Sequence, residues 1–148
     1  MWRTTMLALF VVASAHADDF GVLNVAAHHW NRGAVQSLNL NEKNFGVGYE
    51  HHWGNGSMVM LGVYDNSLRR PSTYGLVGYA PLHIGIVSIG GAAGYVTGYP
   101  VAPLIPALGA LVMVQHGDVG VNVLLVPSME SVGVYGFAGF QLKLKLYK

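Results

Sequence analysis

The sequence predicts an all-β protein, an eight-stranded antiparallel transmembrane β-barrel, from three observations. Only 10% of the 148 residues are charged and 52% are hydrophobic, whereas about a quarter of the residues in soluble domains are charged. Glycine interrupts nearly every apolar run, which disfavours helices, and no run past the N-terminus is long enough to form a transmembrane helix. Several segments alternate apolar with small or polar residues, the period of a β-strand.

The N-terminus is predicted to be a secretory signal peptide, residues 1–17. Trp2-Arg3 is a short basic start, the stretch from Met6 to Ala13 is apolar, and Ala15-His16-Ala17 fits a small-x-small cleavage site. We therefore expect an exported chain with one barrel domain over residues 18–148. The sequence contains no cysteine, which excludes disulfides and lipid attachment at the cleavage site. Without Arg3, basic and acidic residues balance, so a nucleic-acid partner is not expected.

Four strands are expected in the first half of the domain. Apolar and aromatic residues fill the first, alternation with glycine defines the second, the third ends in a polar cluster, and the fourth returns after a short basic turn. Tight turns follow the second and fourth strands at Trp53–Ser57 and Ala80–Leu82, whereas a long polar loop, residues 31–44, follows the first. The expected ranges are Phe20–Trp30, Phe45–Trp53, Ser57–Asn66 and Thr73–Tyr79.

Four more strands are expected in the second half, with a tight turn at His116–Asp118 between the second and the third of them. The last strand alternates leucine with glutamine and lysine. Two proline-containing stretches, Tyr99–Pro106 and Val126–Ser128, interrupt the pattern, and because proline cannot donate to the ladder, the wall is expected to be locally unpaired there. The expected ranges are His83–Thr97, Leu104–Gln115, Val119–Val126 and Val132–Tyr147.

The alternating strands have one apolar face and one small or polar face. In a soluble barrel the small face would be a poor surface, so we expect the apolar face to point outward to lipid and the small and polar face to point inward. Closure of eight strands leaves no unpaired edge. The ends of the odd-numbered strands then share the extracellular rim, which brings His28, His29, Asn66 and Ser67 together. A soluble exported barrel that binds a small apolar ligand is the alternative architecture.

Ser67 beside a rim histidine suggests acyl transfer, because a hydroxyl becomes a good nucleophile when a base accepts its proton. His28 and His29 are adjacent strand residues and must point to opposite faces, so only one can face Ser67. His29 is expected to be that residue because it lies nearer the loop. The alternative is a simple rim turn in which Asn66 and Ser67 only bond the backbone.

Several motifs resemble the PagP family of lipid A palmitoyltransferases. They are Pro103-Leu-Ile-Pro106-Ala-Leu-Gly, Gly120-Val-Asn-Val-Leu-Leu-Val-Pro127, the Gly-Phe-Gln-Leu sequence at Gln141, and Asn66-Ser67 followed by Gly75-Leu-Val-Gly78-Tyr79. The resemblance implies an eight-stranded barrel in the outer membrane of a Gram-negative bacterium, acting as a monomer without a cofactor or metal. It implies transfer of a palmitoyl chain from a phospholipid to the lipid A of lipopolysaccharide by a rim His, Asp and Ser.

Carried over to this chain, the resemblance implies that Ser67, Asn66 and either His28 or His29 are catalytic. Asn66 replaces the family's aspartate and supplies no charge to an imidazolium. Asn66→Asp restores that charge, and a rise in activity would show that the amide weakens an otherwise intact site. Gly78 is expected at the floor of an acyl pocket, where Gly78→Met would shorten the transferred chain. The remaining implied substrate contacts are Pro106 and Pro127, where the wall would open to lipid, and Arg69 and Arg70, which either bind lipid phosphates or form a solvated loop.

Two alternatives to lipid A acylation remain open from sequence. The first is hydrolysis of an acyl chain from lipid A or a phospholipid, which needs the same residues. The second is a non-catalytic small outer-membrane barrel with a structural or lipid-binding role. His51 and His52 lie beside Trp53 and are expected in an interfacial aromatic girdle rather than a metal site.

Overall fold

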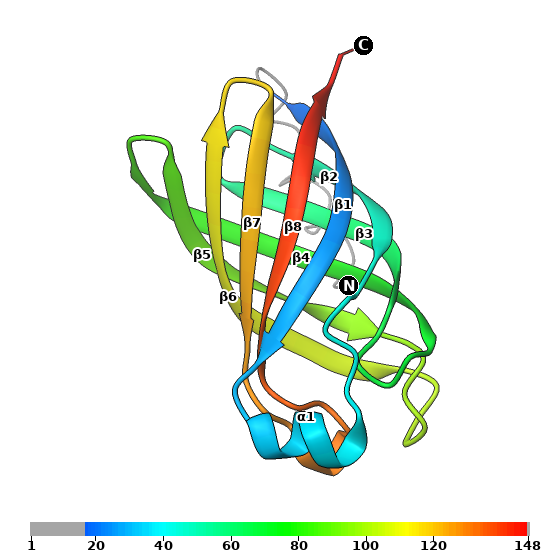
Figure 1. Ribbon diagram of the computed structural model, residues 1–148. Helices are drawn as coiled ribbons and strands as arrows, with labels where there is room; N and C mark the ends of the chain where they lie inside the picture. Colours follow the sequence, from blue (N-terminus) through cyan, green and yellow to red (C-terminus); the bar gives the residue numbers. More distant parts are fainter. Residues whose placement is uncertain (1–16, 148) are drawn as a thin grey trace, which may run out of the picture.

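The computed structural model describes residues 17–147, so the signal peptide expected over residues 1–17 lies almost wholly outside the described residues. Eight strands form one closed antiparallel barrel in sequence order, and β1 pairs with both β2 and β8 to complete it (Figure 1). The predicted fold class is confirmed. The strands are β1 (Asp18–His29), β2 (Gly46–His52), β3 (Ser57–Asp65), β4 (Pro71–Ile84), β5 (Val87–Val96), β6 (Ile105–His116), β7 (Val119–Val126) and β8 (Phe137–Leu146).

The predicted turn at Ala80–Leu82 is wrong, because β4 continues through it to Ile84. The pairing of β4 with β5 shifts between Tyr79 and Leu82, and a proline is tolerated at such a bulge without ending the strand. The chain turns instead at Gly85, whose φ of 61° favours glycine. The predicted start of the last strand at Val132 is also early, because a 3₁₀ turn, η1 (Glu130–Val132), precedes β8.

The segment predicted as a long loop, residues 31–44, contains a short helix, α1 (Arg32–Leu38). The Asn31 side chain caps it by accepting the Ala34 N–H at 3.0 Å. Asn39 ends the helix in the left-handed conformation at φ 51°. No helix within residues 17–147 is long and apolar enough to cross a membrane.

The outer face of the barrel is apolar, as predicted. Large hydrophobic side chains from every strand are exposed there, such as Val77 at 66% and Ile84 at 71%. The same alternation turns the other residues of each strand inward. The barrel therefore has an apolar exterior, the reverse of the arrangement in a soluble barrel.

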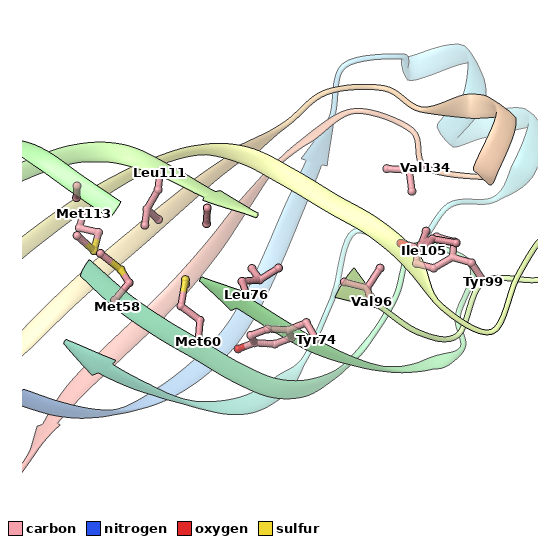
Figure 2. Close-up of a cluster of buried hydrophobic side chains, with 12 residues drawn as sticks. Met58, Met60, Tyr74, Leu76, Val96, Tyr99, Ile105, Leu111, Met113 and Val134 are labelled. Atoms are coloured by element: carbon pink, nitrogen blue, oxygen red, sulfur yellow. The ribbon is translucent and has the colours of Figure 1, made fainter. Parts of the chain in front are cut away.

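The interior is less polar than predicted, because buried apolar side chains fill much of it, as Figure 2 shows. It also holds a buried polar cluster: Asn122 donates to Glu50, and Lys143 Nζ lies 3.6 Å from Glu50 Oε2. The large apolar members of the interior cluster are Met58, Met60, Tyr74, Leu76, Ile105, Leu111 and Met113.

Inward-facing glycines on β2 and β3 make room for the Tyr74 ring. A Cβ added at Gly48 would lie 2.4 Å from the Tyr74 hydroxyl oxygen, and one added at Gly62 would lie 2.5 Å from its ring. No alanine fits at these distances without a shift. The glycines of the alternating strands therefore allow a large interior side chain to cross the lumen.

Candidate active site

The site lies at the rim where β1 and β3 end. His29 is the last residue of β1, and Ser67 follows the end of β3 by two residues. The His29 Nε2 atom lies 2.8 Å from the Ser67 Oγ atom, and both residues are buried. The side chain of His28 is 60% exposed, so His29 is the histidine that faces Ser67.

Glu42, from the segment between α1 and β2, completes the contacts of His29. Its Oε1 atom accepts the His29 backbone N–H at 2.9 Å and lies 3.4 Å from His29 Nδ1. Sequence reasoning missed this residue, although Glu42 is the only carboxylate in residues 31–44. Ser67, His29 and Glu42 thus form a hydroxyl, imidazole and carboxylate series, an arrangement that supports nucleophilic catalysis on several unrelated folds.

Arg32, at the start of α1, holds the Glu42 carboxylate. Its two terminal nitrogens donate to Glu42 Oε1 at 2.6 Å and Oε2 at 3.1 Å. Hydrogen bonding to Arg32, supported by the His29 backbone N–H, lowers the pKa of the Glu42 carboxyl to about 2. Glu42 is therefore ionised at any physiological pH.

Asn66 does not contact His29. Its Nδ2 group donates to Ser72 Oγ at 2.9 Å and to the Gly98 carbonyl at 3.1 Å. Its Oδ1 atom accepts the backbone N–H groups of Leu68 and Arg70 at 2.8 and 3.1 Å. All four bonds fix the turn that presents Ser67, so the structure gives the Asn66 side chain a role in holding this turn.

Ser67 opens onto an internal cavity of about 110 Å³ with a mainly apolar lining. The Tyr99 hydroxyl reaches the Ser67 side chain and that of Tyr64, and the cavity extends inward to Leu76. Pro106 lines the cavity, whereas Pro127 and Gly78 do not. Gly78 faces the lumen, but a Cβ there would meet Met58 Cγ at 2.8 Å, so the Met58 side chain lies over it.

The barrel wall is unpaired at two places near this cavity. β6 pairs with β7 only from Ala110 onward, which leaves Ile105–Gly109 without a partner on that side. β1 pairs with β2 only up to Asn24. Beyond that point the Ala27 N–H bonds instead to the Glu42 carbonyl at 3.0 Å. The proline stretch at Pro106 thus coincides with an interrupted ladder, as the sequence predicts.

The other candidates lie apart from the Ser67 hydroxyl. Arg69 adopts a left-handed φ of 57° and donates to Asn39 Oδ1 at 3.1 Å, and Arg70 is exposed. His51 Nδ1 lies 2.6 Å from Asp19 Oδ1, and His52 Nε2 lies 2.8 Å from Glu50 Oε2. Across residues 17–147, no group of three or more His, Cys, Asp or Glu side chains could hold a metal ion.

Comparisons with known proteins support the fold alone. No family model matches the chain, and no curated protein matches it. The solution NMR structure of the de novo designed protein TMB2.3 is similar, with a TM-score of 0.64 and 14% sequence identity over 91% of this chain and 99% of that one. The chain therefore shares a barrel architecture with this design, and its chemistry must be argued from the site itself.

Proposed function

We propose that this protein is an outer-membrane lipid acyltransferase, which moves an acyl chain from a phospholipid to lipid A of lipopolysaccharide. The observation that supports it most is the 2.8 Å contact between His29 Nε2 and Ser67 Oγ at the mouth of an apolar cavity. A hydroxyl that bonds to an imidazole is ready to lose its proton as it attacks an ester. An apolar cavity beside it suits the acyl chain of that ester.

The residues allow a balanced reaction in two halves. Ser67 Oγ attacks the carbonyl carbon of the phospholipid ester while its proton passes to His29 Nε2. The ester C–O bond breaks, and the lysophospholipid oxygen leaves with that proton. A hydroxyl of lipid A then gives its proton to His29 and attacks the acyl-serine, which releases the acylated product and restores Ser67.

Membrane placement of the barrel belongs to this proposal and rests on the outer surface. The exposed apolar side chains surround the strands on the outside, and closure of the barrel gives each strand a neighbour on both sides, as a bilayer requires of β-structure. The unpaired stretch Ile105–Gly109 offers a lateral route for a lipid chain from the bilayer to the cavity. An outer membrane contains both lipid classes.

Mass spectrometry of lipid A tests this function. A Gram-negative host expressing the wild-type protein should accumulate lipid A with one additional acyl chain, and the host expressing Ser67→Ala should not. Loss of an acyl chain from lipid A or phospholipid would support the hydrolase instead. Unchanged lipids with both proteins, despite detergent-extractable and heat-modifiable barrels, would leave the non-catalytic barrel as the function.

A further inference from the structure

We propose that Glu42 is a positioning residue of the acyl-transfer site, which orients His29 and stabilises its protonated form, in place of a carboxylate at position 66. This inference rests on the proposed function, because it assigns the third member of the same site. It is carried by three contacts of one carboxylate oxygen: Glu42 Oε1 bonds to the His29 backbone N–H, faces His29 Nδ1 and accepts from Arg32.

The contacts determine which imidazole nitrogen carries the proton. A carboxylate facing Nδ1 favours a proton on that nitrogen, which leaves the lone pair of Nε2 directed at Ser67 Oγ, 2.8 Å away. A general base requires this tautomer. The Nδ1 to Oε1 distance of 3.4 Å is long for a hydrogen bond, and the attraction to the ionised carboxylate strengthens when His29 accepts the serine proton.

No other carboxylate in the described part of the chain takes this place. Asp65, which neighbours the turn, is exposed on the outer side of β3. Glu130 belongs to the same rim but is also exposed. The groups that act on His29 electrostatically are Glu42, Arg32 and His28, so Glu42 is the one negative charge among them.

Arg32 gives the carboxylate a fixed orientation. Its two donors bind both oxygens of Glu42, and the side chain of Glu42 is 27% exposed. Bidentate binding by a guanidinium defines the plane of a carboxylate. Glu42 also accepts the His29 backbone N–H, which holds the end of β1 on the side where β2 no longer pairs with it.

Substitution of the purified full-length barrel in detergent tests the inference. Glu42→Gln keeps an oxygen for the backbone N–H but removes the charge, so the acyl-transfer rate should fall about 100-fold or more. The acid limb of the pH–rate profile of this variant should lie at lower pH than that of the wild type. Glu42→Asp should restore part of the rate. ¹⁵N NMR of the His29 ring should show that the imidazole of Glu42→Gln becomes protonated at lower pH than in the wild type.

Glu130→Gln serves as the matched control, because it removes an exposed carboxylate from the same rim; it should leave both the rate and the His29 titration unchanged. If Ser67→Ala abolishes transfer while Glu42→Gln alters neither the rate nor the titration, Glu42 has no role in the site. If no protein transfers acyl chains but the His29 titration moves as expected, the proposed function fails and the pairing of Glu42 with His29 stands.

Discussion

The side-chain amide of Asn66 donates to the hydroxyl of Ser72 at 2.9 Å. This bond spans the base of the turn that presents Ser67, and Asn66 is fully buried. An aspartate at this position would keep the acceptor for Leu68 and Arg70 but would lose both donor bonds. It would also place a carboxylate oxygen near the Gly98 carbonyl oxygen, since the amide nitrogen lies 3.1 Å from it.

Asn66→Asp is therefore expected to lower activity, although it restores the charge that the resemblance implies at this position. Loss of a bond between buried partners costs roughly 1–3 kcal/mol, and the turn that holds Ser67 should loosen. Acyl-transfer rates and thermal unfolding of the purified variant measure both effects. Higher activity than the wild type at equal stability would show that a carboxylate at position 66 reaches His29 after all.

Leu76 is expected to influence the length of the acyl chain, because it lines the inner part of the cavity. Leu76→Ala should lengthen the preferred chain, and each additional buried methylene contributes about 0.8 kcal/mol, roughly a fourfold change in relative rate. Competition between donor phospholipids of different chain lengths measures this preference. Gly78→Met tests the position implied by the resemblance; an altered product with Gly78→Met alone would place the pocket floor deeper, past Met58.

The ion pair of Glu50 with Lys143 is expected to stabilise the polar cluster inside the barrel. Both side chains are 1% exposed, and removal of one partner of a buried pair typically costs about 3–5 kcal/mol. Lys143→Met should thus destabilise the barrel strongly, and Glu50→Gln combined with Lys143→Met should recover much of the loss. Urea titration of the barrels in detergent measures the free energy of unfolding of each variant. Equal stability of the wild type and Lys143→Met would show that the pair contributes nothing.

The Glu42 carboxyl should titrate at unusually low pH while Arg32 is present. Its pKa of about 2 lies below the ordinary value of about 4.3. Because the folded pKa is lowered, the stability that the ionised group contributes is complete above about pH 4.3 and is lost as the pH falls through about 2.

Arg32→Ala is expected to raise the pKa of Glu42 toward its ordinary value, so that the ionised carboxylate contributes less stability and the loss of that contribution is complete at a higher pH. ¹³C NMR of the Glu42 carboxyl in both proteins measures this, and Arg70→Ala, at an exposed arginine of the same rim, is the control. If the Glu42 carboxyl titrates at the same pH in the wild type and in Arg32→Ala, Arg32 does not lower its pKa.

The sequence predicted the barrel because alternation and scarcity of charge are local properties of each strand, and it predicted His29 with Ser67 because strand count fixes which ends share a rim. It could not predict Glu42, since a contact between residues in a rim segment and a strand end depends on how α1 folds back. The extension of β4 past Pro81 was also missed, because proline at a bulge resembles proline in a turn. The sequence did not predict that Met58 and Met60 fill the barrel interior, because the inward and outward faces of β3 are both apolar.

The most direct test of the account is transfer of a radiolabelled acyl chain from a phospholipid to lipid A by the purified protein. Wild-type protein should transfer the label, and Ser67→Ala and His29→Ala should each reduce the rate by about 100-fold or more, with the barrels still folded. His28→Ala, whose ring is exposed, should retain most of the rate. Equal transfer by the wild type, Ser67→Ala and His29→Ala would contradict the assignment of these two residues as the reacting pair.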